Sequence, residues 1–229
     1  MPRGRKRTDS SAGVADTSRL QPAPIRERLI RTSTRLFAER GFDATSVQAI
    51  VESAGVTKGA LYHHFAAKED LLYEIHNEII STELRDAERI VSKQLAPDEC
   101  LRELIVNLIE SIAQFQAGVT VFFREMHRLP EDKWRLVHDA RRTYFRLYLD
   151  VIARGQVEGL LRSDMNPKIV TFALFGTCNW FYTWYNPSGT WSAHEVGQEL
   201  ASVYLNALRP QAITDGQEPP TTVDAEMRN

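Results

Sequence analysis

The stretch that decides the fold is Thr45–Leu72, which reads TSVQAIVESAGVTKGALYHHFAAKEDLL. Apolar residues recur there at three- and four-residue intervals, which predicts helices. The pattern stops at Gly55 and resumes at once, and glycine can adopt a positive φ at little cost where the chain reverses. Thr45 or Ser46 can cap a helix that ends at Gly55.

A second, short helix follows the glycine. Thr57 can cap it, and it is expected over Lys58–Phe65, with its apolar side chains anchoring it to the first helix. Helix, glycine turn and short helix together predict a helix-turn-helix, whose second helix enters the major groove of DNA. The side chains left to face outward are then Lys58, Gly59, Tyr62 and His63.

From Ile25 to Tyr73 the sequence resembles the N-terminal DNA-binding domain of the TetR family of bacterial regulators. The resemblance rests on Phe37 with Gly41 and Phe42, on Gly55, on Tyr62 with Phe65, and on Lys68-Glu69-Asp70-Leu71. It implies that Gly59 and Ala60 pack against the groove and that other side chains touch DNA, mostly at phosphates. The complete set of expected contact residues is Thr45, Thr57, Lys58, Gly59, Ala60, Tyr62, His63 and Lys68.

Bulk charge does not explain DNA binding by this region. Positive and negative side chains balance between Ile25 and Glu74, and the whole chain has a formal net charge of −2. Affinity must therefore come from local placement and from the basic N-terminal arm. His63 and His64 also have a simpler interpretation as ordinary exposed histidines, and Tyr62 as a packed aromatic ring with its hydroxyl at the surface.

The rest of the chain has almost no period-two alternation, so an all-α fold of about nine helices is expected for the 229 residues. We expect a disordered basic arm over 1–23, the helix-turn-helix domain over 24–70, a ligand-binding and dimerisation domain over 71–210, and a disordered tail over 211–229. One helix should start at Pro97 and end near Gly118. Two more, Pro167–Tyr185 and Ala193–Leu208, correspond by resemblance to a four-helix dimer interface.

Three segments, 115–129, 134–149 and 172–186, are rich in aromatic residues, which are usual in a core but also line ligand pockets. The expected ligand residues are Phe115, Phe122, Phe123, Met126, His127, Tyr144, Tyr148, Phe175, Asn179 and Tyr182. Arginines near the mouth of such a pocket could meet phosphates, and the candidates are Arg124, Arg128, Arg141 and Arg142. They have an alternative interpretation as a solvated helix face.

The identity of the ligand is less constrained. GTCNWFYTWYNPSG resembles segments of TetR-type regulators of fatty-acid and steroid catabolism. The hypothesis is therefore a large apolar molecule with an anionic end, an acyl-CoA thioester. The alternative is a planar hydrophobic compound, as in regulators of drug efflux.

Enzyme signatures are missing from the sequence: it has no GxSxG, HExxH, P-loop or dinucleotide fingerprint. Cys100 and Cys178 are the only cysteines and have no metal-ligand spacing, and no cofactor is expected. The sequence contains no run of about 18 apolar residues, so it predicts no membrane-spanning helix. We therefore expect a cytoplasmic protein. The predicted function is a homodimeric repressor that leaves its double-stranded operator when a small hydrophobic effector binds; an activator is the other possibility.

Overall fold

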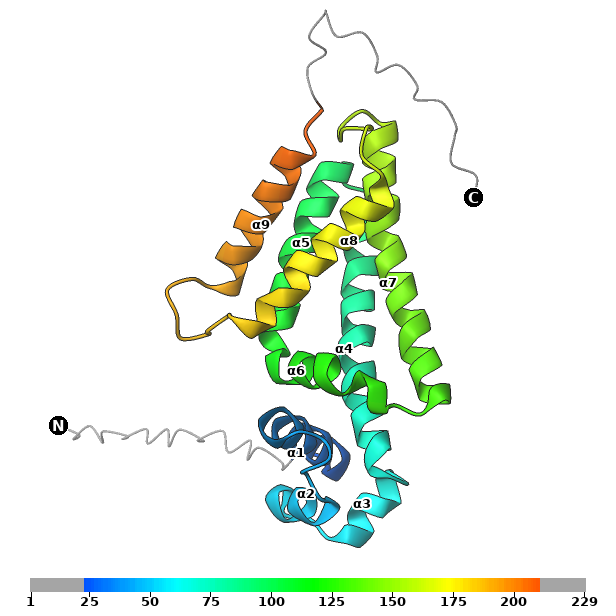
Figure 1. Ribbon diagram of the computed structural model, residues 1–229, viewed down its shortest axis with the longest axis vertical. Helices are drawn as coiled ribbons and strands as arrows, with labels where there is room; N and C mark the ends of the chain where they lie inside the picture. Colours follow the sequence, from blue (N-terminus) through cyan, green and yellow to red (C-terminus); the bar gives the residue numbers. More distant parts are fainter. Residues whose placement is uncertain (1–22, 211–229) are drawn as a thin grey trace, which may run out of the picture.

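The computed structural model describes residues 23–210, and these form nine α-helices with two short 3₁₀ helices (Figure 1). Three helices form a cluster at the lower end of Figure 1: α1 (Ile25–Arg40), α2 (Val47–Ala54) and α3 (Lys58–His64). Helix α4 (Lys68–Val91) leaves this cluster and runs up into the remaining helices. The all-α prediction is confirmed, while the expected arm and tail lie outside the described residues except for Ala23.

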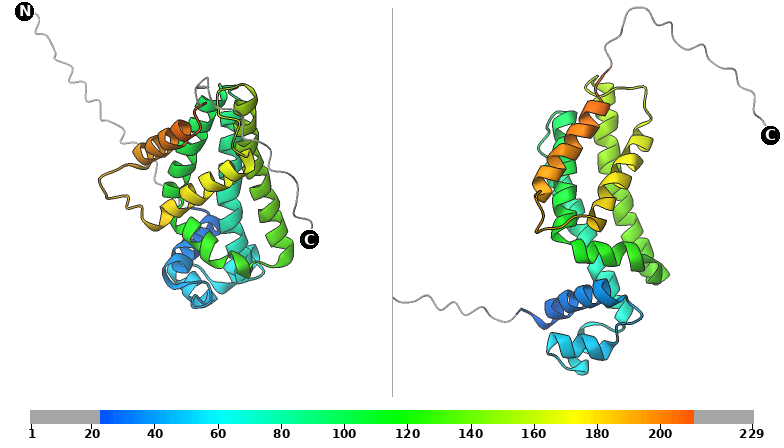
Figure 2. Two further views of the ribbon diagram at one scale, coloured as in Figure 1. Left: turned by 45° about the horizontal axis from the view of Figure 1, so that its top comes forward. Right: turned by 60° about the vertical axis from the view of Figure 1, so that its left-hand side comes forward.

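The remaining helices form an elongated bundle around α4 and α5 (Figure 2). Their bounds are α5 (Pro97–Gln114), α6 (Gln116–Glu125), η1 (Met126–Arg128), α7 (Glu131–Val157), α8 (Pro167–Asn179), η2 (Trp180–Thr183) and α9 (Ala193–Ala207). Helix α9 packs along α5, and α7 packs along α4. Helix α6 lies across the base of the bundle and contacts both α1 and α4, so it joins the two parts of the molecule.

Local signals explain the helix-turn-helix. The Ser46 hydroxyl accepts a hydrogen bond from the Ala49 N–H, and the Thr57 hydroxyl accepts one from the Ala60 N–H. Ser46 and Thr57 are therefore the N-terminal caps of α2 and α3. Gly55 has a φ of 63°, the left-handed conformation that favours glycine. The predicted glycine turn and both caps are therefore confirmed.

Two predicted helix ends are wrong. Helix α5 ends at Gln114, and Gly118 lies inside α6. The role of Gly118 is to let α6 approach α4, because a Cβ atom at this position would be 2.8 Å from Ile79 Cδ1. Helix α8 ends at Asn179 and continues as the 3₁₀ helix η2, so it does not reach Tyr185.

Gly197 lies where α9 packs against α5, and its lack of a side chain allows this contact. A Cβ atom there would lie 3.0 Å from the Cα of Val106, which belongs to the backbone and cannot rotate away. We expect Gly197→Ala to lower the free energy of unfolding by about 1–3 kcal/mol, although alanine favours helix. The control Gly59→Ala meets nothing closer than 3.8 Å and should leave this free energy unchanged or slightly higher in urea unfolding. Equal behaviour of the two variants would refute this account of the contact.

No single helix among residues 23–210 is long and apolar enough to cross a membrane; α5 and the segment Gln116–Arg128 pass that test only together, and they meet at a bend of 88°. Within the same residues, no group of three or more His, Cys, Asp or Glu side chains is placed to hold a metal ion.

Candidate nucleic-acid interface and ligand cavity

Helix α3 presents the face that the sequence predicts. Leu61 is fully buried and anchors the helix, whereas Tyr62 is 54 % exposed. Ala60 is half-buried, and the other expected contact residues of this segment are exposed: Thr57, Lys58, Gly59 and His63. Because α3 lies at the lower end of the molecule in Figure 1, away from α8 and α9, this face is open to a duplex.

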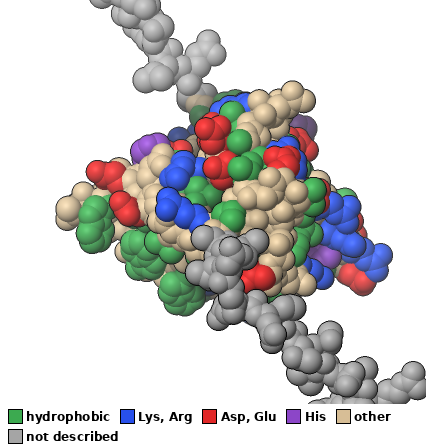
Figure 3. Space-filling model, turned by 90° about the horizontal axis from the view of Figure 1, so that it is seen from above, with side chains coloured by type: hydrophobic (Ala, Val, Ile, Leu, Met, Phe, Trp, Pro, Cys, Tyr) green, Lys and Arg blue, Asp and Glu red, His purple; other side chains and the backbone are tan. Residues whose placement is uncertain are grey.

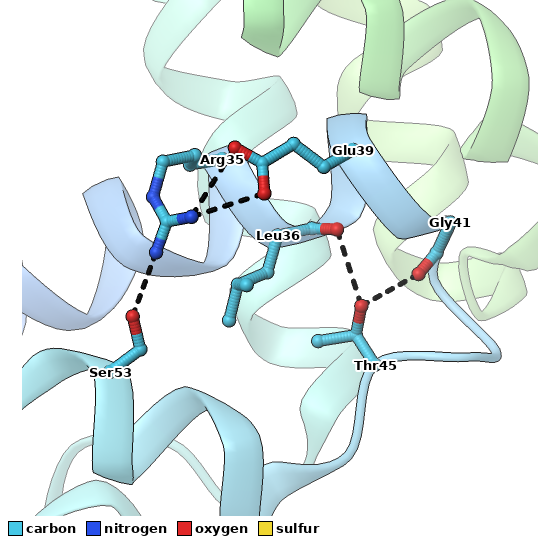
Figure 4. A network of polar contacts seen from close by, with 6 residues as sticks. All are labelled: Arg35, Leu36, Glu39, Gly41, Thr45 and Ser53. Carbon is cyan, nitrogen blue, oxygen red and sulfur yellow. Dashed lines mark hydrogen bonds and ion pairs between the residues drawn. The ribbon is translucent and has the colours of Figure 1, made fainter.

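Thr45 does not belong to this face, contrary to the expectation from resemblance. Its side chain is fully buried, and its hydroxyl donates to the Gly41 carbonyl oxygen at 2.8 Å and lies 3.3 Å from that of Leu36 (Figure 4). Figure 4 also shows Arg35 bonded to Ser53, which ties α1 to α2. Thr45 therefore fixes the loop between α1 and α2 and has no side-chain atom available to DNA.

Lys68 is also used inside the domain. Its ammonium group donates to the Phe42 carbonyl oxygen at 2.7 Å and to the Thr45 carbonyl oxygen at 3.0 Å, and it lies 4.1 Å from the centre of the Phe42 ring. Only the third N–H is left for a phosphate. The principal contact of Lys68 is thus with the α1–α2 loop, which it holds against the start of α4.

We expect Lys68→Met to lower the free energy of unfolding by about 1–3 kcal/mol, because two carbonyl oxygens lose their partner. The exposed Lys58→Met is the matched control: it should leave that free energy unchanged and should reduce the salt dependence of DNA binding by about one unit. Urea unfolding and salt titrations of DNA affinity measure both effects. A Lys68→Met protein as stable as the wild type would contradict the clamping role.

A cavity of about 160 Å³ lies between α4, α5, α6, α7 and α8. Its walls are mainly apolar and aromatic, as in ligand pockets generally. The lining residues are Ile79, Ile80, Glu83, Ile112, Val119, Phe122, Phe123, Arg141, Tyr144, Phe145, Phe172, Phe175 and Asn179.

Half of the expected ligand residues line this cavity: Phe122, Phe123, Tyr144, Phe175 and Asn179. The others do not. Tyr148 is fully buried in the core, where its hydroxyl donates to the Leu104 carbonyl oxygen at 2.9 Å and is 2.8 Å from the Tyr144 hydroxyl.

The remaining expected residues lie around the cavity or away from it. Tyr182 is absent from the lining and stacks on the pocket residue Phe123, with ring centres 5.3 Å apart. Phe115 lines a separate groove between α1, α4 and the start of α6. Met126 and His127 belong to η1 and are absent from the lining.

Glu83 is the polar lining residue that the sequence reasoning missed. It is 9 % exposed, and burial raises the pKa of its carboxyl group to about 7. The signal was available, because Glu83 is an acidic residue within the apolar stripe of α4 that contains Ile79 and Ile80. Arg141 lines the same cavity with its guanidinium 4.7 Å from the centre of the Phe122 ring, and burial lowers its pKa.

A basic groove of about 650 Å³ adjoins the cavity between α7 and α8. Three of its lining residues, Arg141, Phe145 and Phe172, also line the cavity, so the two spaces are contiguous. In the part of the chain that the structure describes, no acidic side chain lines the groove. The full lining, hereafter the basic groove, is His138, Arg141, Arg142, Phe145, Arg146, Leu149, Lys168 and Phe172.

Two of the four arginines expected at the pocket mouth are elsewhere. The Arg124 guanidinium donates to the Ala38 carbonyl oxygen at 3.4 Å, and Arg128 pairs with Asp43. Arg124 therefore contacts α1, and Arg128 contacts the α1–α2 loop. Arg141 and Arg142 do lie at the groove.

Further contacts connect the cavity wall to the α1–α2 loop and to the start of α4. Helix α6 carries Phe122 and Phe123 into the cavity, and its last residue, Glu125, accepts a hydrogen bond from the Phe42 N–H at 3.1 Å. At the start of α7, Lys133 pairs with Asp70 of α4. A shift of the cavity wall would therefore reach the α1–α2 loop directly.

Large apolar side chains are exposed on α8, α9 and the connection between them. Figure 3 shows hydrophobic side chains at the surface on its left, the side toward which this connection projects in Figure 1. The exposed residues of this region are Ile169, Phe172, Trp180, Trp184, Trp191 and Val203. An apolar surface of this kind marks an interaction site.

Comparison with known proteins covers both parts of the chain. Residues 29–75 match the family model described as bacterial regulatory proteins, tetR family, and residues 94–208 match that of the tetracyclin repressor-like C-terminal domain. The transcriptional repressor KstR2 of Mycolicibacterium smegmatis is 29 % identical over 189 residues, which cover 82 % of this chain and 92 % of the relative.

Solved structures give the same result. The ketosteroid transcriptional regulator KstR2 of Mycobacterium tuberculosis superposes with a TM-score of 0.77 at 29 % identity, covering 83 % of this chain and 98 % of that one. AibR in complex with isovaleryl coenzyme A and operator DNA superposes with a TM-score of 0.70 at 24 % identity, covering 82 % and 99 %, and shares the fold.

Proposed function

Because the chain belongs to the TetR family of bacterial transcriptional regulators, we propose that it is a repressor that binds operator DNA as a homodimer and leaves it when a small CoA thioester binds. The KstR2 relatives are named as repressors, which favours repression over activation. The expected place of action is the cytoplasm, where the DNA lies.

The DNA-binding part of the proposal rests on the exposed face of α3. Lys58, Tyr62 and His63 would contact the major groove, and Gly59 would let the backbone approach it. The apolar surface of α8 and α9 would pair with its copy in a second chain. Two α3 helices then require a pseudo-palindromic operator with half-sites about 34–36 Å apart or a multiple of that distance.

The observation that carries the ligand proposal is the contiguity of an apolar cavity with a basic groove. A CoA thioester has the matching chemistry, an apolar acyl group joined to a phosphate-bearing chain. Arg142, Arg146 and Lys168 supply donors for phosphate oxygens, which form strong charge-assisted hydrogen bonds. In AibR the same fold is found in complex with isovaleryl coenzyme A and operator DNA.

The cavity size refines the expectation of a large apolar ligand. An apolar protein cavity of about 150 Å³ holds one benzene molecule, and the cavity here measures about 160 Å³. This volume favours a short branched chain or a single ring as the acyl group, which is smaller than the large apolar molecule expected from the sequence. The alternative ligand, a planar hydrophobic compound, would use the aromatic rings of the cavity and would leave the cations of the basic groove without a partner.

Calorimetry with matched compounds tests the ligand. We expect cyclohexanecarbonyl-CoA to bind, and both free CoA and cyclohexanecarboxylate to bind at least about 100-fold more weakly, because each fills only one of the two spaces. Tight binding of a planar cationic drug without binding of the thioester would overturn the proposal. Selection from a random duplex library tests the operator: the enriched sequences should be pseudo-palindromes.

A further inference from the structure

Two ionisable side chains line the mainly apolar and aromatic cavity, whose other polar lining group is the amide of Asn179. Glu83 comes from α4 and Arg141 from α7. Each affects the pKa of the other: the charge of Arg141 favours the ionised form of Glu83, and the charge of Glu83 favours that of Arg141. Both residues line the same cavity of about 160 Å³, and no ion pair joins them within residues 23–210.

Neither side chain is well paired by the protein. The Glu83 carboxyl group has one hydrogen bond, accepted at 3.4 Å from the Ser111 hydroxyl, and the residue is 9 % exposed. The Arg141 guanidinium makes no hydrogen bond and no ion pair with any described residue, and its contact is with the face of the Phe122 ring. Buried polar groups are normally paired, and an unpaired one is costly. Glu83 is buried and Arg141 is half-buried at the border with the basic groove, so a ligand that enters the cavity meets both groups.

We propose that the acyl group of the ligand carries an uncharged oxygen function, a keto or hydroxyl group, which binds between the Glu83 carboxyl and the Arg141 guanidinium. This inference rests on the proposed CoA-thioester function and names the acyl class. Arg141 N–H groups donate to the ligand oxygen. Glu83 accepts from a hydroxyl group when ionised and donates to a keto oxygen when protonated, and with a pKa of about 7 both forms are present near neutral pH.

Other acyl groups fit these two side chains less well. A plain hydrocarbon would remove water from Glu83 and Arg141 without replacing its hydrogen bonds. A carboxylate on the ring would pair with Arg141 but would be repelled by ionised Glu83, and an ammonium group would be repelled by Arg141. An uncharged oxygen satisfies both residues without bringing a further charge into the cavity.

The test uses three thioesters with one ring skeleton: cyclohexanecarbonyl-CoA and its derivatives with an oxo or a hydroxyl group on ring carbon 3 or 4. We expect the better oxygenated ligand to bind the full-length protein at least about tenfold more tightly than the plain ring, measured by calorimetry. Glu83→Leu should reduce this preference to less than about threefold, because one of the two groups that bind the oxygen is gone and only the half-buried Arg141 remains.

Control variants separate recognition from folding. Glu83 forms no ion pair with a described residue, so Glu83→Leu leaves no broken salt bridge and should fold. Glu83→Gln keeps a donor and an acceptor and should keep most of the preference. Glu88→Leu removes the same charge from an exposed position on α4 outside the cavity and should change nothing.

Equal affinity of the wild type for the plain and oxygenated thioesters would overturn this inference and leave the proposed function intact. A preference that survives in Glu83→Leu would overturn the placement of the oxygen beside Glu83. If no thioester binds and a planar cationic drug does, the proposed function fails, and this inference fails with it.

Discussion

Simultaneous replacement of Arg142, Arg146 and Lys168 by glutamine is expected to weaken binding of cyclohexanecarbonyl-CoA by at least about 100-fold. All three line the basic groove. A hydrogen bond to a charged group contributes about 1.5–3 kcal/mol, and solvent screening reduces this for exposed side chains, so three contacts give a total of about 3 kcal/mol. Calorimetry at several salt concentrations should also show affinity falling with salt for the wild type and much less for the variant.

The matched control replaces Arg85, Arg89 and Lys93 by glutamine. These residues lie on or just after α4, outside the cavity and the basic groove, and the charge change is the same. Its thioester affinity should match that of the wild type, and both triple variants should bind DNA normally without ligand. An equal loss in the two variants would mean that net charge, and not the groove, governs binding.

The second large effect is expected at Glu125. We expect Glu125→Ala to bind the thioester with wild-type affinity within about threefold but to need at least about tenfold more of it to release DNA. Glu125 is the residue through which α6, a wall of the cavity, holds the Phe42 N–H of the α1–α2 loop. Without this contact, a ligand-induced shift of α6 no longer favours the release-competent state, and the coupling free energy between the two sites falls.

Glu131→Ala is the control for this variant, because Glu131 is exposed at the start of α7 and pairs only with the nearby Arg135 among the described residues. Its DNA release should resemble that of the wild type. Normal release by Glu125→Ala would show that the contact of Glu125 with the Phe42 N–H does not carry the coupling. Helix α4 is a second physical connection between the two sites, since Ile79 and Ile80 line the cavity and α4 begins at the helix-turn-helix.

The helix-turn-helix was predictable because its determinants are local. Gly55, with Ser46 and Thr57 as caps, sets two helices within a few residues of chain, and each does so in the structure. Thr45 shows the limit of this reasoning. Resemblance gives its position in the chain, but the direction of its hydroxyl depends on carbonyl groups of α1 and the following loop.

The ligand cavity was less predictable because helical spacing does not decide which side chains line a void. Tyr144 and Tyr148 lie one turn apart on the same face of α7, yet one lines the cavity and the other fills the core. The basic groove likewise combines arginines of α7 with Lys168 of α8. Only the packing of α7 against α8 brings these charges together.

The most direct test of the account is release of DNA by the thioester. A labelled duplex carrying the selected operator is saturated with protein, and its fluorescence anisotropy is followed while cyclohexanecarbonyl-CoA or its oxygenated derivatives are added. The account predicts that anisotropy falls to the value of free duplex with a thioester and stays high with free CoA or free acid at the same concentrations. A duplex that stays bound while calorimetry shows the cavity filled by thioester would contradict it.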